Sequence, residues 1–166
     1  MEDAVLHWSV RLAVFCYGAR VWTEMSMIHH DQSASLVRRA RLWWTAGGVM
    51  FALHVICAFA FVHTWSHSQA YRYTANTTET MIGLSWGGGL YFNYAFTFFW
   101  LADLAAWWLF DARFPYQSSR YFFALHAFFA FMVFQATVVF GPMGWKWMFC
   151  FVVIAGATKL YLVRYK

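Results

Sequence analysis

Residues 42–65, LWWTAGGVMFALHVICAFAFVHTW, form the apolar run that decides the fold class of this chain. The run contains no Asp, Glu, Lys or Arg. A helix needs about 20 consecutive apolar residues to cross the hydrocarbon core of a bilayer. The run therefore predicts a membrane-spanning helix.

The composition extends this prediction to the whole chain. Of 166 residues, 62% are hydrophobic and only 11% are charged, whereas about a quarter of the residues of a soluble domain are charged. This length has room for five or six spanning helices and for no large soluble domain. We predict an all-α integral membrane protein with a single transmembrane domain over residues 1–166.

The apolar runs predict a bundle of five transmembrane helices with short loops. The first run contains Arg11 and Arg20, and a central Arg costs about 2.5 to 3.5 kcal/mol on insertion scales. An interfacial helix is the alternative for this run, which would leave four spans. Residues 66–83 are polar and are expected to form an outer loop. The expected spans are residues 4–22, 42–65, 84–110, 119–141 and 145–163.

The basic residues predict the orientation, because Lys and Arg collect on cytoplasmic loops. In the five-span arrangement one side holds little beyond Arg72 and Lys146, and the other side holds most of the arginines. The N-terminus is therefore expected outside and the C-terminus in the cytoplasm. The net charge of +5 does not indicate a nucleic-acid partner, because the basic residues flank apolar runs and form no basic patch.

Two histidines inside the apolar runs, His54 and His126, are candidate ligands of a b-type haem, for which histidine is a usual axial ligand. Counted from Arg41 and Arg120, they differ in depth by about 10 Å at the 1.5 Å rise of a helix. That offset disfavours a haem bound by both residues. The alternative is that each is a hydrogen-bonded histidine of the core.

Three outer histidines, His7, His63 and His67, are candidate ligands of zinc or copper, both of which suit imidazole. His63 and His67 are four residues apart, a spacing that places them on one face of a continuous helix. No Asp or Glu accompanies them at helical spacing. The alternative is that they are amphipathic residues of the membrane interface.

The stretch GLSWGGGLYFNY, residues 83–94, brings polar groups into the outer half of the predicted third span. Trp86, Tyr91 and Asn93 are expected to line a polar pocket with His63, between the second and third spans. This pocket would hold a small ligand or a quinone headgroup, or would join two helices by hydrogen bonds.

Arg20 and Asp103 lie at similar depths near the inner face, and ionisable residues inside a membrane are costly unless they are paired. We therefore predict a buried ion pair between them. Its role would be either a clamp between helices or a proton-relay or substrate site.

These features favour a small multi-pass membrane protein with a binding, structural or accessory-subunit role. Its partners would be the lipid bilayer and other membrane subunits or further copies of the chain. No catalytic residues are predicted, because no nucleotide loop, nucleophile elbow or HExxH motif is present. Two alternatives stay open: an electron-transfer protein with haem b, and a metal-handling or transport protein with zinc or copper at the outer histidines. The simplest expectation is that no cofactor is bound.

Overall fold

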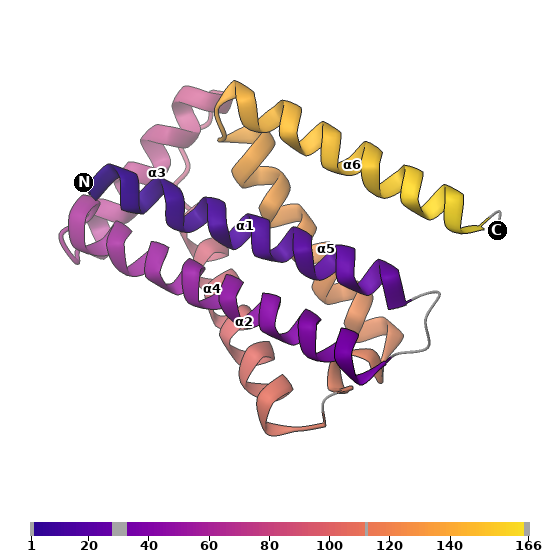
Figure 1. The fold of residues 1–166 in the computed structure, drawn as a ribbon. Helices are drawn as coiled ribbons and strands as arrows, with labels where there is room; N and C mark the ends of the chain where they lie inside the picture. The colour runs from indigo at the N-terminus through magenta and orange to yellow at the C-terminus, as the bar shows by residue number, and fades with distance from the viewer. Residues whose placement is uncertain (1, 28–32, 112, 165–166) are drawn as a thin grey trace.

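The computed structural model describes residues 2–27, 33–111 and 113–164. Within these residues the chain is almost entirely helical and forms no strand, so the predicted all-α class is confirmed. Figure 1 shows the longer helices, which are α1 (Glu2–Met27), α2 (Ala34–Cys57), α3 (His67–Ile82), α4 (Gly89–Leu109), α5 (Ser119–Phe134) and α6 (Met143–Arg164).

Two of these helices continue as π-helical turns. The turn η1 (Ala58–Val62) extends α2, and the turn η3 (Gln135–Val139) extends α5. A short 3-10 turn, η2 (Phe114–Tyr116), connects α4 to α5. The segments Ala34–Val62 and Ser119–Val139 are long and apolar enough to cross a membrane, and they correspond to the second and fourth spans expected from the sequence.

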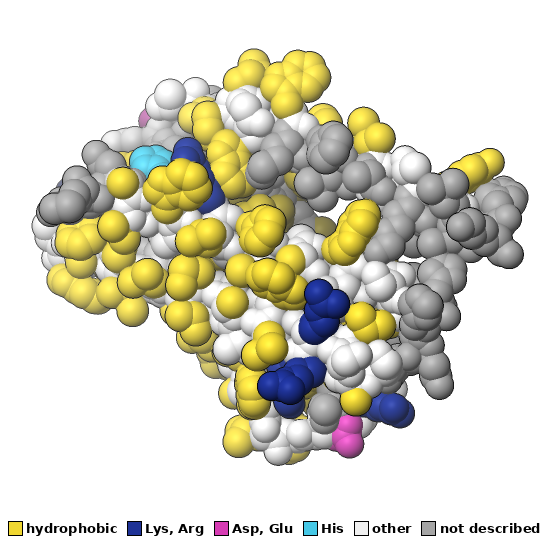
Figure 2. Space-filling model, viewed as in Figure 1, with side chains coloured by type: hydrophobic (Ala, Val, Ile, Leu, Met, Phe, Trp, Pro, Cys, Tyr) yellow, Lys and Arg dark blue, Asp and Glu magenta, His cyan; other side chains and the backbone are white. Residues whose placement is uncertain are grey.

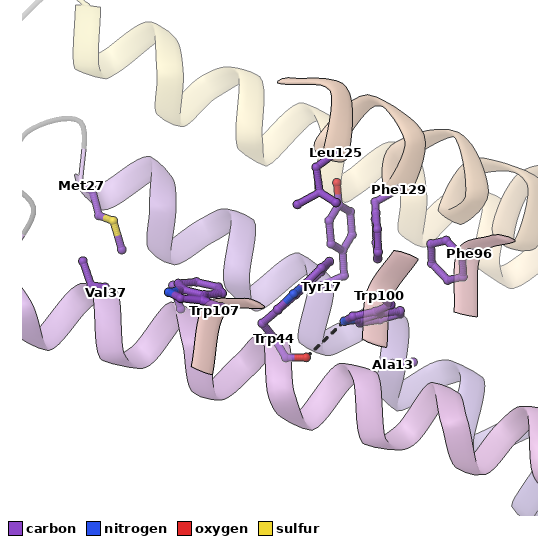
Figure 3. Close-up of a cluster of buried hydrophobic side chains, with 11 residues drawn as sticks. Ala13, Tyr17, Met27, Val37, Trp44, Phe96, Trp100, Trp107, Leu125 and Phe129 are labelled. Atoms are coloured by element: carbon purple, nitrogen blue, oxygen red, sulfur yellow. Dashed lines mark hydrogen bonds between the residues drawn. The ribbon is translucent and has the colours of Figure 1, made fainter. Parts of the chain in front are cut away.

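The core forms where α1 and α2 lie side by side and α4 and α5 cross them (Figure 1). Aromatic side chains from three helices meet there, and Figure 3 shows Trp44, Trp100 and Phe129 grouped together. The Trp100 Nε1 donates to the backbone carbonyl of Trp44 at 3.3 Å. A Cβ on Gly47 would lie 2.7 Å from Trp100 Cζ2, so this close approach requires glycine.

The outer loop expected at residues 66–83 is instead the helix α3. Its ends carry ordinary helix signals: the Ser66 side chain accepts a hydrogen bond from the Gln69 N–H, and Gly83 ends the helix with a φ of 74°. Ala70 and Thr78 are buried, so the helix is amphipathic. A loop was expected because the segment as a whole is polar, whereas an amphipathic helix is recognised from the periodicity of its buried positions.

The last helix, α6, packs mainly against η3. Phe134 of α5 and Phe149 of α6 contact each other edge to face, with ring centroids 5.8 Å apart. Figure 1 shows α6 running along one side of the molecule, away from α2. The two helices α5 and α6 are thus neighbours in sequence and in space.

Candidate functional site

A group of ionisable side chains is buried where α1, α4 and α5 meet. We call Arg20, Glu24, Asp103 and His126 the ionic cluster. Arg20 is 0% exposed, Asp103 3% and Glu24 8%, and the His126 side chain is 16% exposed. Because burying a charge is costly unless it is paired and hydrogen-bonded, the contacts of each member decide what the cluster can do.

Arg20 lies at the centre of the ionic cluster. Its Nε donates to Glu24 Oε1 at 2.8 Å, and its Nη1 is 3.9 Å from Asp103 Oδ2. The guanidinium lies over the rings of Trp44 and Trp107, at 3.9 and 4.9 Å from their centroids. Neither Nη atom has a hydrogen-bond partner among the described residues, so the two aromatic faces add to the stabilisation that the carboxylates give the charge.

Asp103 connects three helices through its carboxylate. Trp44 Nε1 of α2 donates to Asp103 Oδ2 at 2.7 Å, and the Tyr121 hydroxyl of α5 donates to Asp103 Oδ1. Hydrogen bonds to a charged acceptor are stronger than neutral ones. The carboxylate of α4 therefore holds α2 and α5 at fixed positions.

Glu24 makes the corresponding connections at the end of α1. Its Oε1 also accepts from the Tyr116 hydroxyl at 3.0 Å, and its Oε2 is 3.1 Å from His126 Nε2. Burial and then the negative charge of Glu24 raise the pKa of Tyr116, so its hydroxyl remains a donor. The Tyr17 hydroxyl lies 3.4 Å from His126 Nδ1.

The interior of the ionic cluster is closed to ligands. Arg20, Trp44 and Trp107 are completely buried, which leaves no room for a substrate beside the guanidinium. The arrangement is therefore suited to joining helices.

The sequence placed Arg20 and Asp103 together, and the structure brings them within 3.9 Å. It did not identify Glu24, which is the nearer carboxylate, or His126 as members of the same cluster. One signal was present, since residues 20 and 24 are one helical turn apart. Glu24 lies beyond the apolar run at residues 4–22, so it is not among the charges expected inside the membrane.

The two candidate haem ligands lie in different places. His54 Nδ1 donates to the Leu6 carbonyl at 2.9 Å, near the start of α1, whereas His126 contacts Glu24 near its end. Leu6 and Glu24 are separated by about 27 Å along a helix. The structure does not bring these histidines to one haem, and both have polar partners in the interior.

The outer histidines do not share a helix face, contrary to the expectation. The helix is interrupted between His63 and His67, where Thr64 and Trp65 have φ angles of 45° and 58°. His63 is buried against aromatic rings, and His67 is exposed and hydrogen-bonded to the Tyr94 hydroxyl at 3.0 Å.

His7 lies on α1, also exposed. Across the part of the chain that the structure describes, no three His, Cys, Asp or Glu residues are grouped as metal ligands.

The expected polar pocket differs in its position and its lining. Tyr91 lines a shallow cavity of about 440 Å³ together with His67 and residues 68, 71 and 72 of α3. The cavity lies between α3 and α4, not between the second and third expected spans. Trp86 instead packs against Phe92, and Asn93 is exposed. The position of the pocket differs from the prediction because α3 covers this part of α4.

Comparisons of the chain with protein-family models, with curated proteins and with solved structures find no match.

Proposed function

We propose that the protein is a multi-pass integral membrane protein with a structural or accessory-subunit role, with its N-terminus outside and its C-terminus in the cytoplasm. The exposed apolar surface supports this proposal. Phe15 of α1, Val49 of α2, Phe98 of α4 and Phe123 of α5 are 62%, 52%, 68% and 70% exposed. Large contiguous apolar patches are rare on soluble monomers, and Figure 2 shows hydrophobic side chains spread over α1 and α2. Acyl chains would cover this surface.

The length of α5 together with η3 fits the thickness of a bilayer. The segment Ser119–Val139 has 21 residues, which at 1.5 Å per residue span about 31 Å, close to the hydrocarbon core of about 30 Å. We extend the proposal to α1, α4 and α6. For α1 the main objection is the cost of inserting Arg20, and the contact with Glu24 reduces that cost because the charges are paired.

The ionic cluster is the single observation that carries the proposed role. It joins α1, α4 and α5 by direct contacts and α2 through Trp44, and its members bond to one another in the interior. Such an arrangement fixes how helices pack and does not receive a substrate from solution. It therefore acts as a clamp between helices, which suits a protein that presents a fixed apolar surface to other membrane subunits or to copies of itself.

Cysteine labelling tests the topology. A cysteine in place of Asn76 should react with an impermeant maleimide from outside, and one in place of Ser35 should react only after the membrane is permeabilised. Both positions are exposed. The background should carry Cys150→Ser, because Cys150 is exposed whereas Cys16 and Cys57 are buried. The opposite labelling pattern would show that the orientation is the reverse of the proposed one. Labelling of both positions from outside would show that they lie on the same side of the membrane, which contradicts an odd number of spans between them.

The particle mass tests the accessory role. We expect light scattering in mild detergent to give a protein mass above that of one chain, from either partner subunits or further copies. A strictly monomeric particle that keeps its fold would contradict this role while leaving the membrane topology intact.

A further inference from the structure

A second site lies at the opposite end of α1 from the ionic cluster. There a cavity of about 200 Å³ opens between α1, η3 and the start of α6. We call it the outer cavity. Its polar lining comes from His7, Arg11 and Thr137, and its apolar lining includes Val14, Phe140 and Trp145.

Arg11 gives the outer cavity a positive charge. Its guanidinium lies 5.2 Å from the ring centroid of Trp8 and 5.6 Å from that of Trp145. Among the side chains that the structure describes, no carboxylate lies within 4.0 Å of Arg11. Figure 2 shows a histidine beside a basic side chain over the N-terminal part of α1, next to hydrophobic side chains. The surroundings of Arg11 thus differ from those of Arg20, which has a carboxylate within hydrogen-bond distance.

The wall opposite Arg11 is the π-helical turn η3. Thr137 is 2% exposed and donates its hydroxyl to the Val133 carbonyl at 2.7 Å, which leaves its oxygen as an acceptor. A Cβ on Gly141 would lie 2.3 Å from the Thr137 carbonyl oxygen, so the turn after η3 folds closely back on it.

The size and charge of the outer cavity restrict its ligand. Sites for drug-sized molecules usually occupy about 300 to 1,000 Å³, so a cavity of about 200 Å³ suits one small group. A guanidinium binds a phosphate or carboxylate group with directed hydrogen bonds. The described lining includes no carboxylate, so a ligand that also carries an ammonium group would find no ion-pair partner for it and would place a second cation near Arg11. The neighbouring apolar residues suit a hydrocarbon chain.

We propose that the outer cavity binds the headgroup phosphate of an anionic phospholipid through Arg11, with the acyl chains lying on the adjacent apolar surface. This inference rests on the proposed membrane location. Arg11 supplies the charge, and Trp8 and Trp145 hold its guanidinium in place. His7 also lines the outer cavity.

Native mass spectrometry of the detergent-solubilised protein tests the proposal. Phosphatidylglycerol and phosphatidylcholine with the same acyl chains are each titrated. Arg11→Gln removes the charge, and Ala136→Phe fills the outer cavity while keeping Arg11. The matched control is Arg39→Gln, which removes a charge from an exposed arginine of α2. Each variant is first checked, without added lipid, for an unchanged melting temperature.

We expect phosphatidylglycerol to bind the native protein about tenfold more tightly than phosphatidylcholine, because the trimethylammonium group of phosphatidylcholine offsets the charge of its phosphate and is repelled by Arg11. Arg11→Gln and Ala136→Phe should each weaken binding of phosphatidylglycerol by about tenfold or more, and Arg39→Gln should leave it unchanged. Should Arg11→Gln fail to fold, Ala136→Phe alone decides the test.

Three results would overturn the lipid site: equal affinity for the two lipids, full binding by a folded Arg11→Gln or Ala136→Phe protein, or displacement of the lipid by millimolar inorganic phosphate, which would assign the site to a free anion. Alkaline carbonate extraction separates this failure from that of the proposed function. A protein released by carbonate is not integral to the membrane, whereas a protein that stays in the membrane but does not distinguish the lipids lacks only the lipid site.

Discussion

Arg20 should be coupled more strongly to Glu24 than to Asp103, and two double-mutant cycles measure the difference. The first cycle combines Arg20→Met with Glu24→Gln, and the second combines Arg20→Met with Asp103→Asn. Both amide substitutions remove a charge and keep the size of the side chain. Each also keeps a carbonyl oxygen that can accept from Tyr116 or from Trp44, so the cycles report mainly on charge.

The distances give the expected order. At an effective dielectric constant of 20, unit charges attract by about 6 kcal/mol at the 2.8 Å between Arg20 Nε and Glu24 Oε1, and by about 4 kcal/mol at the 3.9 Å between Arg20 Nη1 and Asp103 Oδ2. Only the first contact is also a hydrogen bond. Measured coupling energies of contacting residues are about 0.5 to 3 kcal/mol. We therefore expect about 2 to 3 kcal/mol for the first cycle and about 1 kcal/mol for the second.

The single substitution Arg20→Met should destabilise the protein by about 3 to 5 kcal/mol, because it leaves buried carboxylates without their cation. The assay is unfolding by SDS in mixed micelles, followed by tryptophan fluorescence, which gives a free energy of unfolding. Arg39→Met is the matched control; Arg39 is exposed, so the change should lie within about 0.5 kcal/mol.

A coupling energy for Asp103 equal to or larger than that for Glu24 would refute this reading of the ionic cluster. An Arg20→Met protein as stable as the native one would refute the clamp itself. In that case the free-energy cost of desolvating the guanidinium would equal the stabilising free energy of its contacts, as happens for some buried ion pairs.

Three further predictions concern other parts of the molecule. Gly47→Ala should lose about 1 to 3 kcal/mol of unfolding free energy, because its Cβ meets Trp100. The control Gly18→Ala, where nothing lies within 4 Å, should be neutral or gain up to about 1 kcal/mol. Equal effects of the two substitutions would contradict the close packing of Gly47 against Trp100. Above pH of about 10 the unfolded protein releases tyrosine protons while the folded protein keeps that of Tyr116, so stability should fall with rising pH, less steeply in Tyr116→Phe; identical slopes would count against the burial of this hydroxyl. The purified protein should show no haem band in a reduced-minus-oxidised spectrum, because the two candidate ligands contact opposite ends of α1; a stoichiometric band would require another ligand pair.

The sequence was most informative where hydrophobicity alone determines the structure. The apolar runs at 42–65 and 119–141 correspond to helical segments long enough to cross a bilayer. The polar helix α3 was missed although its signals were present, since Ser66 begins it and Gly83 ends it. Mean polarity over residues 66–83 suggested a loop, and only the spacing of the buried positions distinguishes an amphipathic helix from one.

Positions that depend on rotation about a helix axis were harder to predict. Depth in the membrane can be counted from the sequence, and it placed Arg20 and Asp103 at the same level. Depth does not show which neighbouring helix a side chain faces, so the contact between Glu24 and His126 could not be found. Helical spacing failed for His63 and His67 because the chain leaves the helix between them, and no Gly or Pro in the sequence marks that break.

The two ends of α1 show how the same residue type serves different needs. Arg20 is surrounded by carboxylates and aromatic rings of the protein, so the ionic cluster is nearly complete in itself and its energy contributes to folding. Arg11 has aromatic neighbours but no described carboxylate within reach, and a cation beside an apolar surface is stabilised most by an anion from outside the protein. If both arginines were structural, neutralising either one should lower stability whatever lipid is present. The arrangement instead predicts that Arg11→Gln is less stable than the native protein only when phosphatidylglycerol is added, since a ligand stabilises only the state that binds it. The stability lost in Arg20→Met should be the same with and without this lipid.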